Sequence, residues 1–354
     1  MGKPFDKELA YIPNTIKWSF TEPIGSELKV MISKLSAYPL LVVGSGGSFS
    51  SAQFIAQLHE EMTGQMAKAV TPLELHFSKT NPSSHAILIL TASGNNRDIL
   101  HSLEIAVKRE FVSIGILCAN IGSKIAKKAE SYSPYIQVTE YSNPAKKDGF
   151  LAVNSLLSTC ILAGRAYKAF SISEKTVKEL AEHKADFEEP DWNEVLSRKT
   201  IIALGGEWAW PVLTDLESKF SEAGLGNILI TDLRNFGHGR HHWFDEKGEE
   251  SALLVLETPV LSKLAEKTLS LIPAQYPRKV LRSYLNGPLA GIDLFNQVFH
   301  LIYKASTLVG IDPGKPKVSE FGRKLYHIGF PRSSIDIRFN NRDTWLQRKL
   351  RGES

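Results

Sequence analysis

The chain has 354 residues, a length that predicts about two domains. Apolar residues make up 43% and charged residues 23%, which is an ordinary soluble composition, and no apolar run approaches the ~20 residues that span a bilayer. The net charge of +4 suits an anionic small molecule and is too small to predict nucleic-acid binding by itself. The N-terminus has no apolar signal core, and Cys118 and Cys160 lie in apolar runs, so we expect a cytoplasmic protein.

Short apolar runs alternate with amphipathic stretches along the first half of the chain. The predicted buried strands are residues 39–43, 86–90, 112–118 and 135–138, and the predicted helices include residues 52–62 and 98–108. This alternation predicts a parallel sheet with helices on both faces.

The same pattern returns in the second half. Strands are predicted at residues 200–204, 227–230 and 252–256, with a helix at 212–223. The two halves have the same order and size, which indicates an internal duplication. We therefore expect an α/β protein built as follows: a first unit with an N-terminal helical segment, residues 1–170; a charged linker helix, 171–198; a second unit, 199–330; and a basic tail, 331–354, of the kind that forms a solvated surface helix.

A glycine-rich loop, Gly44-Ser45-Gly46-Gly47-Ser48, follows the first predicted strand and opens a helix. Glycines let backbone N–H groups approach an anion, and the N-terminus of a helix favours negative charge. A dinucleotide fingerprint needs a third glycine where Phe49 stands, and serine hydroxyls are supplied here instead. The loop predicts phosphate binding by Gly46, Gly47 and Ser48, although a tight turn without a ligand has the same pattern.

A second polar loop, residues 91–96, follows the next long strand and opens another helix. Thr91, Ser93 and Asn96 are short hydrogen-bonding residues in this loop, and an asparagine in such a place is also a common helix cap. Ligands of open α/β sheets bind at the carboxyl ends of the strands. Two such loops at successive parallel strands therefore predict a phosphate site.

Acid–base residues are concentrated in the second half. Asp215, Lys219 and Glu222 share one helix face, an arrangement that also suits a surface ion-pair ladder. His238 lies between two glycines, where a ligand can approach closely, and histidine titrates near neutral pH. His241 and His242 follow without a carboxylate or cysteine at ligand spacing, so we expect no metal.

These residues together resemble the sugar isomerase (SIS) family, as found in the isomerase portion of glucosamine–fructose-6-phosphate aminotransferase. The resemblance covers roughly residues 25–325, without the glutamine-hydrolysing domain of that enzyme, and implies two tandem flavodoxin-like units. Gly46-Gly47-Ser48 is similar to the family's Gly-Thr-Ser loop, and residues 91–94 are similar to its Ser-x-Ser-Gly loop. These loops bind the 6-phosphate of the sugar in the family.

The resemblance also implies roles in the second half. Glu222 matches the family's proton-transfer glutamate, and Lys219 matches a lysine beside the reacting carbons. His238 matches a histidine that assists ring opening in the neighbouring subunit, which implies a homodimer. Lys324 is the nearest counterpart of a C-terminal lysine that contacts the open-chain sugar, although its register differs. Gly206 replaces a family arginine, and Arg240 replaces a proline.

We expect an enzyme that acts at C1 and C2 of a hexose 6-phosphate. The sugar is expected to be an amino or amine-linked sugar, and the reaction to be isomerisation, deamination or deglycation. A carboxylate such as Glu222 shuttles the proton through an enediol or enaminol if burial raises its pKa, and Lys219 stabilises the developing negative charge. No cofactor or membrane is expected. The alternatives are a non-catalytic phosphosugar-binding regulator and, on the basic tail alone, a nucleic-acid-associated protein.

Overall fold

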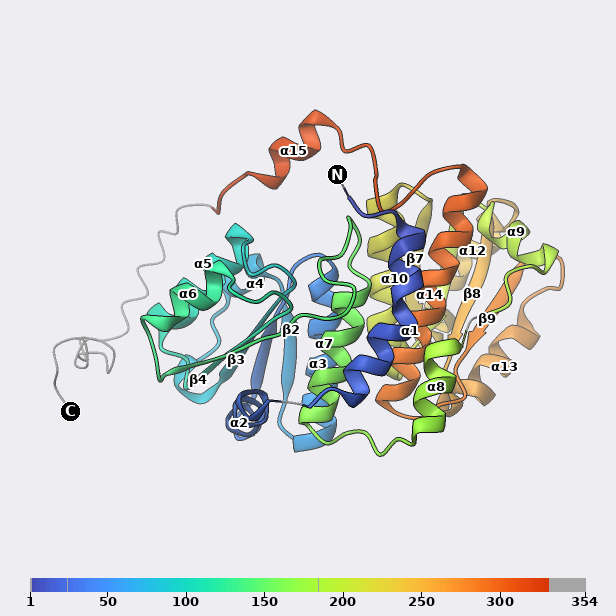
Figure 1. Ribbon diagram of the computed structural model, residues 1–354. Coiled ribbons are helices and arrows are strands. Elements are labelled where there is room, and N and C mark those ends of the chain that lie inside the picture. The colour runs from blue at the N-terminus through green and yellow to red at the C-terminus, as the bar shows by residue number, and fades with distance from the viewer. Residues whose placement is uncertain (1, 24, 184, 331–354) are drawn as a thin grey trace.

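The computed structural model describes residues 2–23, 25–183 and 185–330, and the predicted basic tail at 331–354 lies outside them. Two parallel sheets stand side by side with a layer of helices between them (Figure 1). Within the described residues, no helix has both the length and the apolar character that spanning a bilayer requires. The expected α/β fold with two parallel sheets is confirmed.

The first sheet has the strand order β2-β1-β3-β4-β5, which is the order of flavodoxin-like proteins. Its strands are β1 (Leu40–Val43), β2 (Ala67–Val70), β3 (Ala86–Thr91), β4 (Ser113–Cys118) and β5 (Ile136–Glu140). The helices of this half are α1 (Phe5–Thr21), α2 (Ser26–Leu35), α3 (Gly47–Thr63), α4 (Pro72–Phe77), α5 (Arg97–Arg109), α6 (Lys124–Glu130) and α7 (Asn154–Ala166). The four strands predicted here are present, and β2 at the sheet edge is an additional one.

The predicted linker contains two helices in place of one, α8 (Glu174–Glu182) and α9 (Pro190–Leu196). Pro190 starts the second helix, since proline has no N–H to donate and fits the first turn. Asp186 and Glu188, with the residues around them, form the connection between the two helices.

The second sheet has the order β7-β6-β8-β9, which corresponds to the β2-β1-β3-β4 part of the first sheet. Its strands are β6 (Thr200–Gly205), β7 (Asn227–Asp232), β8 (Ser251–Glu257) and β9 (Arg278–Arg282). The helices of this half are α10 (Trp210–Ala223), α11 (Leu233–Asn235), α12 (His241–Lys247), α13 (Ser262–Leu271), α14 (Pro288–Val309) and α15 (Glu320–Tyr326).

One apolar core runs through both halves. It continues from Phe5 and Ile16 in α1, through Phe54 in α3 and Trp208 before α10, to Phe299 in α14. Smaller cores lie on the outer faces of the two sheets, under α4, α5 and α6 on one side and under α12 and α13 on the other. Because the large core contains both inner sheet faces, the two units are packed as one body.

We expect Phe54→Ala to lower the free energy of unfolding of the whole chain by about 3–5 kcal/mol, the usual cost of removing a buried aromatic side chain. Phe54 is fully buried, and its ring centroid lies 4.9 Å from that of Trp208. Urea unfolding followed by circular dichroism measures the change, and Phe321→Ala, at a side chain that is 69% exposed, is the matched control. A variant in which only part of the signal shifts would show that the halves unfold separately.

Candidate functional site

The first predicted loop reverses the chain between β1 and the N-terminus of α3. Gly46 has φ +53°, a left-handed conformation that favours glycine, and a Cβ on Gly47 would lie 2.4 Å from the Cβ of Ala152. No side chain of the described residues caps the start of α3. The N–H groups of Ser48 and Phe49 donate to the carbonyls of Ser45 and Gly46, at 3.2 and 2.8 Å. An anion at this end of α3 is therefore favoured by the helix dipole and by the serine hydroxyls.

The second predicted loop is held by its own side chains. Thr91 is buried, and its Oγ1 accepts a hydrogen bond from the N–H of Gly94 at 3.0 Å. Asn96 caps α5 by accepting from the N–H of Asp98 at 2.7 Å, and its Nδ2 donates to the hydroxyl of Tyr326 at 3.0 Å. Asn96 is thus a helix cap in this structure, while Ser93, half-buried, faces a cavity.

The two loops meet at a pair of adjoining cavities that share Ala92 and Ser155. The smaller one is enclosed by Gly47 and Ser48 together with the start of α7. The larger one has a volume of about 430 Å³, within the ~300–1,000 Å³ usual for small-molecule sites, and Ser93 and the segment 142–150 line it. The structure therefore brings the predicted phosphate loops together at the carboxyl edge of the first sheet.

Sequence reasoning missed the third segment of this site, residues 142–155. Lys146, Lys147 and Ser155 line the larger cavity, and the two lysines bring positive charge to it. A signal was present, since this polar stretch follows β5 and belongs to the same carboxyl edge as the other two loops. The segment was missed because it contains no glycine-rich motif and because no helix starts directly after β5.

Lys219 and Asp215 form a buried ion pair between the two units. The Nζ of Lys219 donates to Asp215 Oδ1 at 2.5 Å and lies 5.1 Å from the ring centroid of Phe299, and both charged side chains are at most 1% exposed. Burial raises the pKa of the Asp215 carboxyl, and the Lys219 ammonium and Ser50 act in the opposite direction. Direct contact between Lys219 and a sugar therefore requires this pair to open.

Glu222 lies near the end of α10, and the course of that helix brings it toward the phosphate loop. Trp208, just before α10, packs on Phe54 and donates its Nε1–H to Glu61 at 3.1 Å, while Asp215 faces Ser50. Moving forward along α10 thus means moving backward along α3, so the two helices are antiparallel. Asp215 is already level with the first turn of α3, so two further turns of α10, ~10 Å of helix rise, carry Glu222 beyond the N-terminus of α3, the end that carries the glycine-rich loop.

The Glu222 side chain is exposed and accepts a hydrogen bond from the hydroxyl of Ser218 at 2.7 Å. Glu217 accepts from Ser221 at 3.3 Å on the same helix. The described part of this chain therefore leaves the Glu222 carboxylate open to solvent.

His238 is exposed in a turn that follows β7, with its backbone outside the helical region. Glu222 precedes β7 and His238 follows it, so the two residues stand at opposite ends of a six-residue strand. Such a strand is about 20 Å long. The two residues therefore cannot contact the same sugar carbon atoms within one chain.

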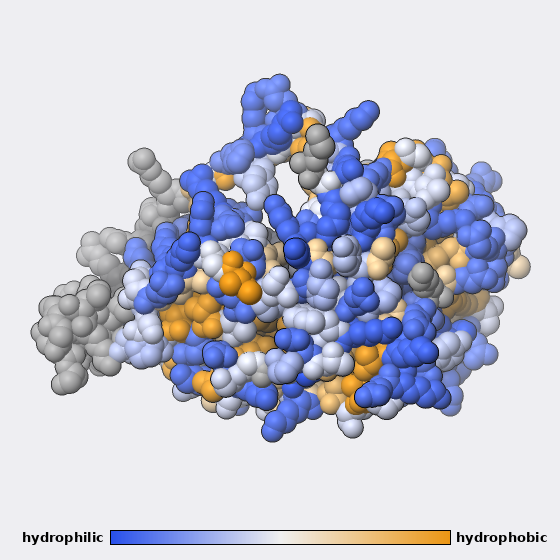
Figure 2. Space-filling model, in the orientation of Figure 1, coloured by the Kyte–Doolittle hydropathy of each residue, from blue (hydrophilic) through white to orange (hydrophobic). Residues whose placement is uncertain are grey.

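Lys324 lies on α15, away from the cavities described above. Its Nζ is 2.8 Å from Glu320 on the same helix, and the Lys324 side chain is 76% exposed. The α15 segment contacts the body through Tyr326, whose hydroxyl accepts a hydrogen bond from Asn96, and Figure 2 shows open space beside this segment. Lys324 is thus two residues from a contact with the second predicted loop, and it lines neither of the two cavities.

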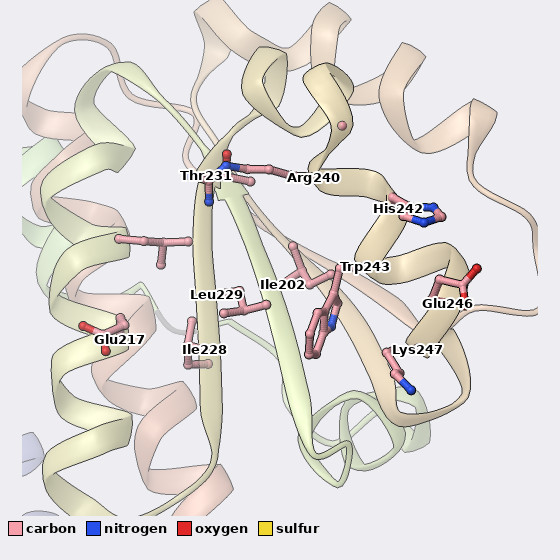
Figure 3. Close-up of a pocket in the computed structure, with 12 residues that line it drawn as sticks. Ile202, Glu217, Ile228, Leu229, Thr231, Arg240, His242, Trp243, Glu246 and Lys247 are labelled. Carbon is pink, nitrogen blue, oxygen red and sulfur yellow. The ribbon is translucent and has the colours of Figure 1, made fainter.

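A further groove lies along β7, the outer strand of the second sheet (Figure 3). Leu229 and Trp243 form its apolar part, and both are partly exposed. On the adjoining helix, ligand atoms of His242, Asp245 and Glu246 lie within 4.8 Å of one another, and all three side chains are exposed. His238 and His241 lie outside that group.

No protein-family model matches the chain, and no curated protein matches it. Solved structures do match. Glucosamine-6-phosphate deaminase from Thermotoga maritima is 18% identical, with 89% of this chain and 98% of that one covered and a TM-score of 0.66. Tagatose-6-phosphate ketose/aldose isomerase from Escherichia coli is 16% identical, with 89% and 96% covered and a TM-score of 0.67.

The C-terminal domain of glucosamine–fructose-6-phosphate aminotransferase from Francisella tularensis also matches, at 13% identity, with 88% of this chain and 96% of that one covered and a TM-score of 0.60. Identities this low establish architecture alone. The chain therefore has the fold of these phosphosugar isomerases and deaminases along nearly its whole described length.

Proposed function

We propose that the protein binds a hexose 6-phosphate and transfers a proton between C1 and C2 of its open-chain form. The observation that carries this proposal is the antiparallel packing of α3 and α10, which brings Glu222 toward the helix end that carries Ser48. A phosphate at the start of α3 fixes the sugar, and the other end of the sugar can then reach a carboxylate on α10.

The phosphate is proposed to lie at the positive end of α3 and to accept hydrogen bonds from the hydroxyls of Ser48 and Ser93. Asn96 is proposed to contribute less to phosphate binding than the sequence predicts, because its side chain already caps α5 and contacts Tyr326. Gly46 and Gly47 let the backbone of the loop lie close to the phosphate. A side chain at position 46 would be strained by the positive φ, and one at position 47 would collide with Ala152.

Glu222 is proposed to remove the proton from one carbon and to return it to the other through an enediol. The same transfer through an enaminol serves deamination or deglycation of an amine-bearing sugar, and the matched deaminase supports this second candidate. The structural likeness thus favours the general class of phosphosugar isomerase or deaminase. Lys219 stabilises the developing charge if its pair with Asp215 opens, and otherwise fixes the position of α10.

Ring opening is proposed to use His238 of a second copy of the chain. The length of β7 between Glu222 and His238 supports this assignment, because one chain cannot bring both to one sugar. The groove along β7 ends beside Gly239 and Arg240, and it offers a partly apolar surface that a second copy can cover. The proposed enzyme is therefore a homodimer with composite sites.

Ser48→Ala and Ser93→Ala should each weaken the binding of a hexose 6-phosphate by about 1–3 kcal/mol, the usual effect of losing a hydrogen bond to a charged group. Calorimetry with the sugar and with its 6-phosphate measures this effect. Ser142→Ala, at an exposed serine of the same cavity outside both phosphate loops, is the control. Equal affinity of the wild-type protein for the sugar and its phosphate would contradict phosphate binding.

Glu222→Gln should lower the turnover rate by ~100-fold or more, because a positioned acid–base group contributes about that much. Ligand affinity should stay close to that of the wild type. The measurement is exchange of the C1 or C2 hydrogen of the sugar with deuterated water, across a panel of hexose 6-phosphates and their amine adducts.

The control for this experiment is Glu266→Gln, at an exposed glutamate of α13 that lines none of the cavities described above. It should exchange at the wild-type rate. Undiminished exchange by Glu222→Gln would refute the assigned role. A wild-type protein that binds phosphosugars and exchanges none of them would be the non-catalytic regulator.

Sedimentation at micromolar concentration should give twice the 39.3 kDa mass of the chain. His238→Asn should slow reaction of ring-closed sugars and largely spare substrates that are already open, because only ring opening needs the histidine. A monomer with full activity would exclude the shared site.

A further inference from the structure

A second cavity adjoins the proposed phosphate site across the segment 147–150. The cavity that holds Ser93 is lined on one side by Lys147 and its neighbours, and the same residues line another cavity together with Lys3 and Lys315. Lys146 lines only the first cavity and Lys315 only the second, whereas Lys147 lines both. The two cavities are therefore neighbours with one lysine in common.

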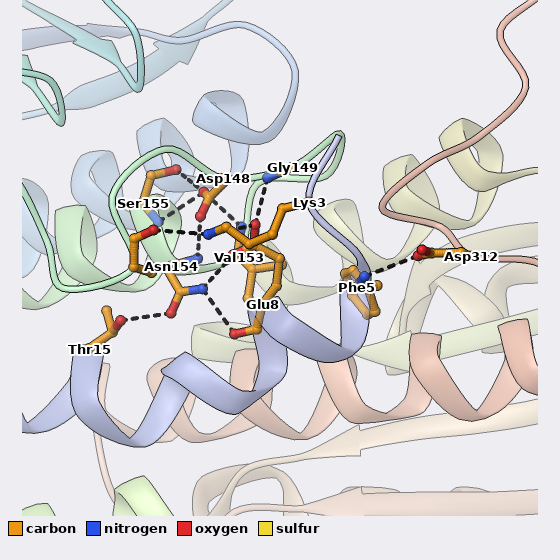
Figure 4. A network of polar contacts seen from close by, with 11 residues as sticks. Lys3, Phe5, Glu8, Thr15, Asp148, Gly149, Val153, Asn154, Ser155 and Asp312 are labelled. Atoms are coloured by element: carbon orange, nitrogen blue, oxygen red, sulfur yellow. Dashed lines mark hydrogen bonds and ion pairs between the residues drawn. The ribbon is translucent and has the colours of Figure 1, made fainter. Parts of the chain in front are cut away.

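The shared segment is held in place by a network of polar contacts (Figure 4). Asp148 accepts hydrogen bonds from the backbone N–H groups of Val153, Asn154 and Ser155, at 3.1, 3.2 and 3.0 Å, and so occupies the N-terminus of α7. Gly149 donates its N–H to Glu8 at 2.6 Å. The lysines beside them are thus presented by a backbone that has little freedom to move.

Two features of this network are energetically unfavourable. Glu8 is fully buried, and burial together with the Asp148 carboxylate raises its pKa, with Lys3 at 3.0 Å acting against this. Lys146 has φ +58°, which is unfavourable for a residue with a side chain. Strain that the surroundings hold in place is found at ligand sites more often than elsewhere.

The balance of charge in the second cavity is positive. Lys3 is paired with Glu8, and the Asp148 carboxylate is compensated by the N-terminus of α7. Lys147 and Lys315 are exposed, and neither has an ion-pair partner within the described residues. Two uncompensated ammonium groups on the wall of a concave site favour an anionic ligand.

We propose that the cavity between Lys147 and Lys315 binds a second acidic group of the substrate, a carboxylate or a further phosphate carried at the end remote from the 6-phosphate. This inference rests on the proposed function. The serine loops and the start of α3 already provide for the 6-phosphate, and Lys315 lies only in the second cavity. The favoured substrates are therefore phosphosugars whose C1 or C2 substituent is itself acidic.

The test compares ligands that differ only in the second charge. Calorimetry is run with the 6-phosphate of a fructosyl adduct of glycine and with the matching glycinamide adduct. Fructose 6-phosphate and fructose 1,6-bisphosphate form a second pair, which separates a carboxylate from a phosphate. The wild-type protein should bind the more acidic member of at least one pair about tenfold more tightly, as a hydrogen bond to a charged group provides.

Lys315→Gln should remove this preference and leave the affinity for the less acidic member unchanged. Lys147→Gln should weaken binding of the more acidic member more strongly than that of the other, because Lys147 lines both cavities. Lys317→Gln, an exposed lysine that lines neither cavity, is the matched control and should keep the preference. Lys146→Gln should weaken the binding of both members of a pair equally, because that lysine lines only the first cavity.

Several results would overturn the inference. If the wild-type protein binds both members of each pair equally, the second acidic site is absent, while the proposed function stands. If Lys147→Gln weakens both members to the same extent, Lys147 serves the 6-phosphate alone. If no 6-phosphate binds at all, the proposed function fails, and this inference fails with it.

Discussion

The antiparallel packing of α3 against α10 determines how the two halves of the chain present their polar residues to each other. Trp208 fixes its register through Phe54 and the hydrogen bond to Glu61. Sliding α10 by one turn would break that hydrogen bond and leave a cavity beside Phe54, both of which cost stability. The buried pair of Asp215 and Lys219 continues the same face. The position of Glu222 relative to the phosphate loop therefore depends on side chains that lie outside both phosphate loops.

The interior strands of both sheets could be predicted from the sequence, and two of the four edge strands could not. The central strands β3, β4 and β6 are buried throughout and are read as apolar runs. The strands that were missed, β2 and β9, lie at sheet edges, where short or charged strands are common because they discourage pairing with other chains. The sequence Arg278-Lys279-Val280-Leu281-Arg282 has charged ends and little apolar periodicity, although it pairs fully with β8.

Some residues of the candidate site could likewise be predicted from the sequence, and others could not. Polar loops after strands carry local signals, so Ser48 and Ser93 could be singled out as candidates from the sequence, and both line the paired cavities. Lys146 and Lys147 could not be, because their place depends on contacts of the neighbouring Ala145 and Gly149 with Lys3 and Glu8, which lie more than 140 residues earlier in the chain. For Asn96 the sequence predicted the position but a different role, because its side chain caps α5. Local pattern predicts which loops are polar, and tertiary packing decides which of their atoms face the cavity.

The course of α1 has a consequence for how the protein is made. Its apolar side chains Phe5, Ile12 and Ile16 belong to the central core, and the N–H of Phe5 donates to Asp312 at 3.0 Å. The helix that completes their cover, α14, leaves the ribosome near the end of synthesis. At ~5–20 residues per second, α1 waits on the order of tens of seconds for that partner. During this interval an apolar helix stays incompletely covered on the nascent chain, and chaperones can bind it there.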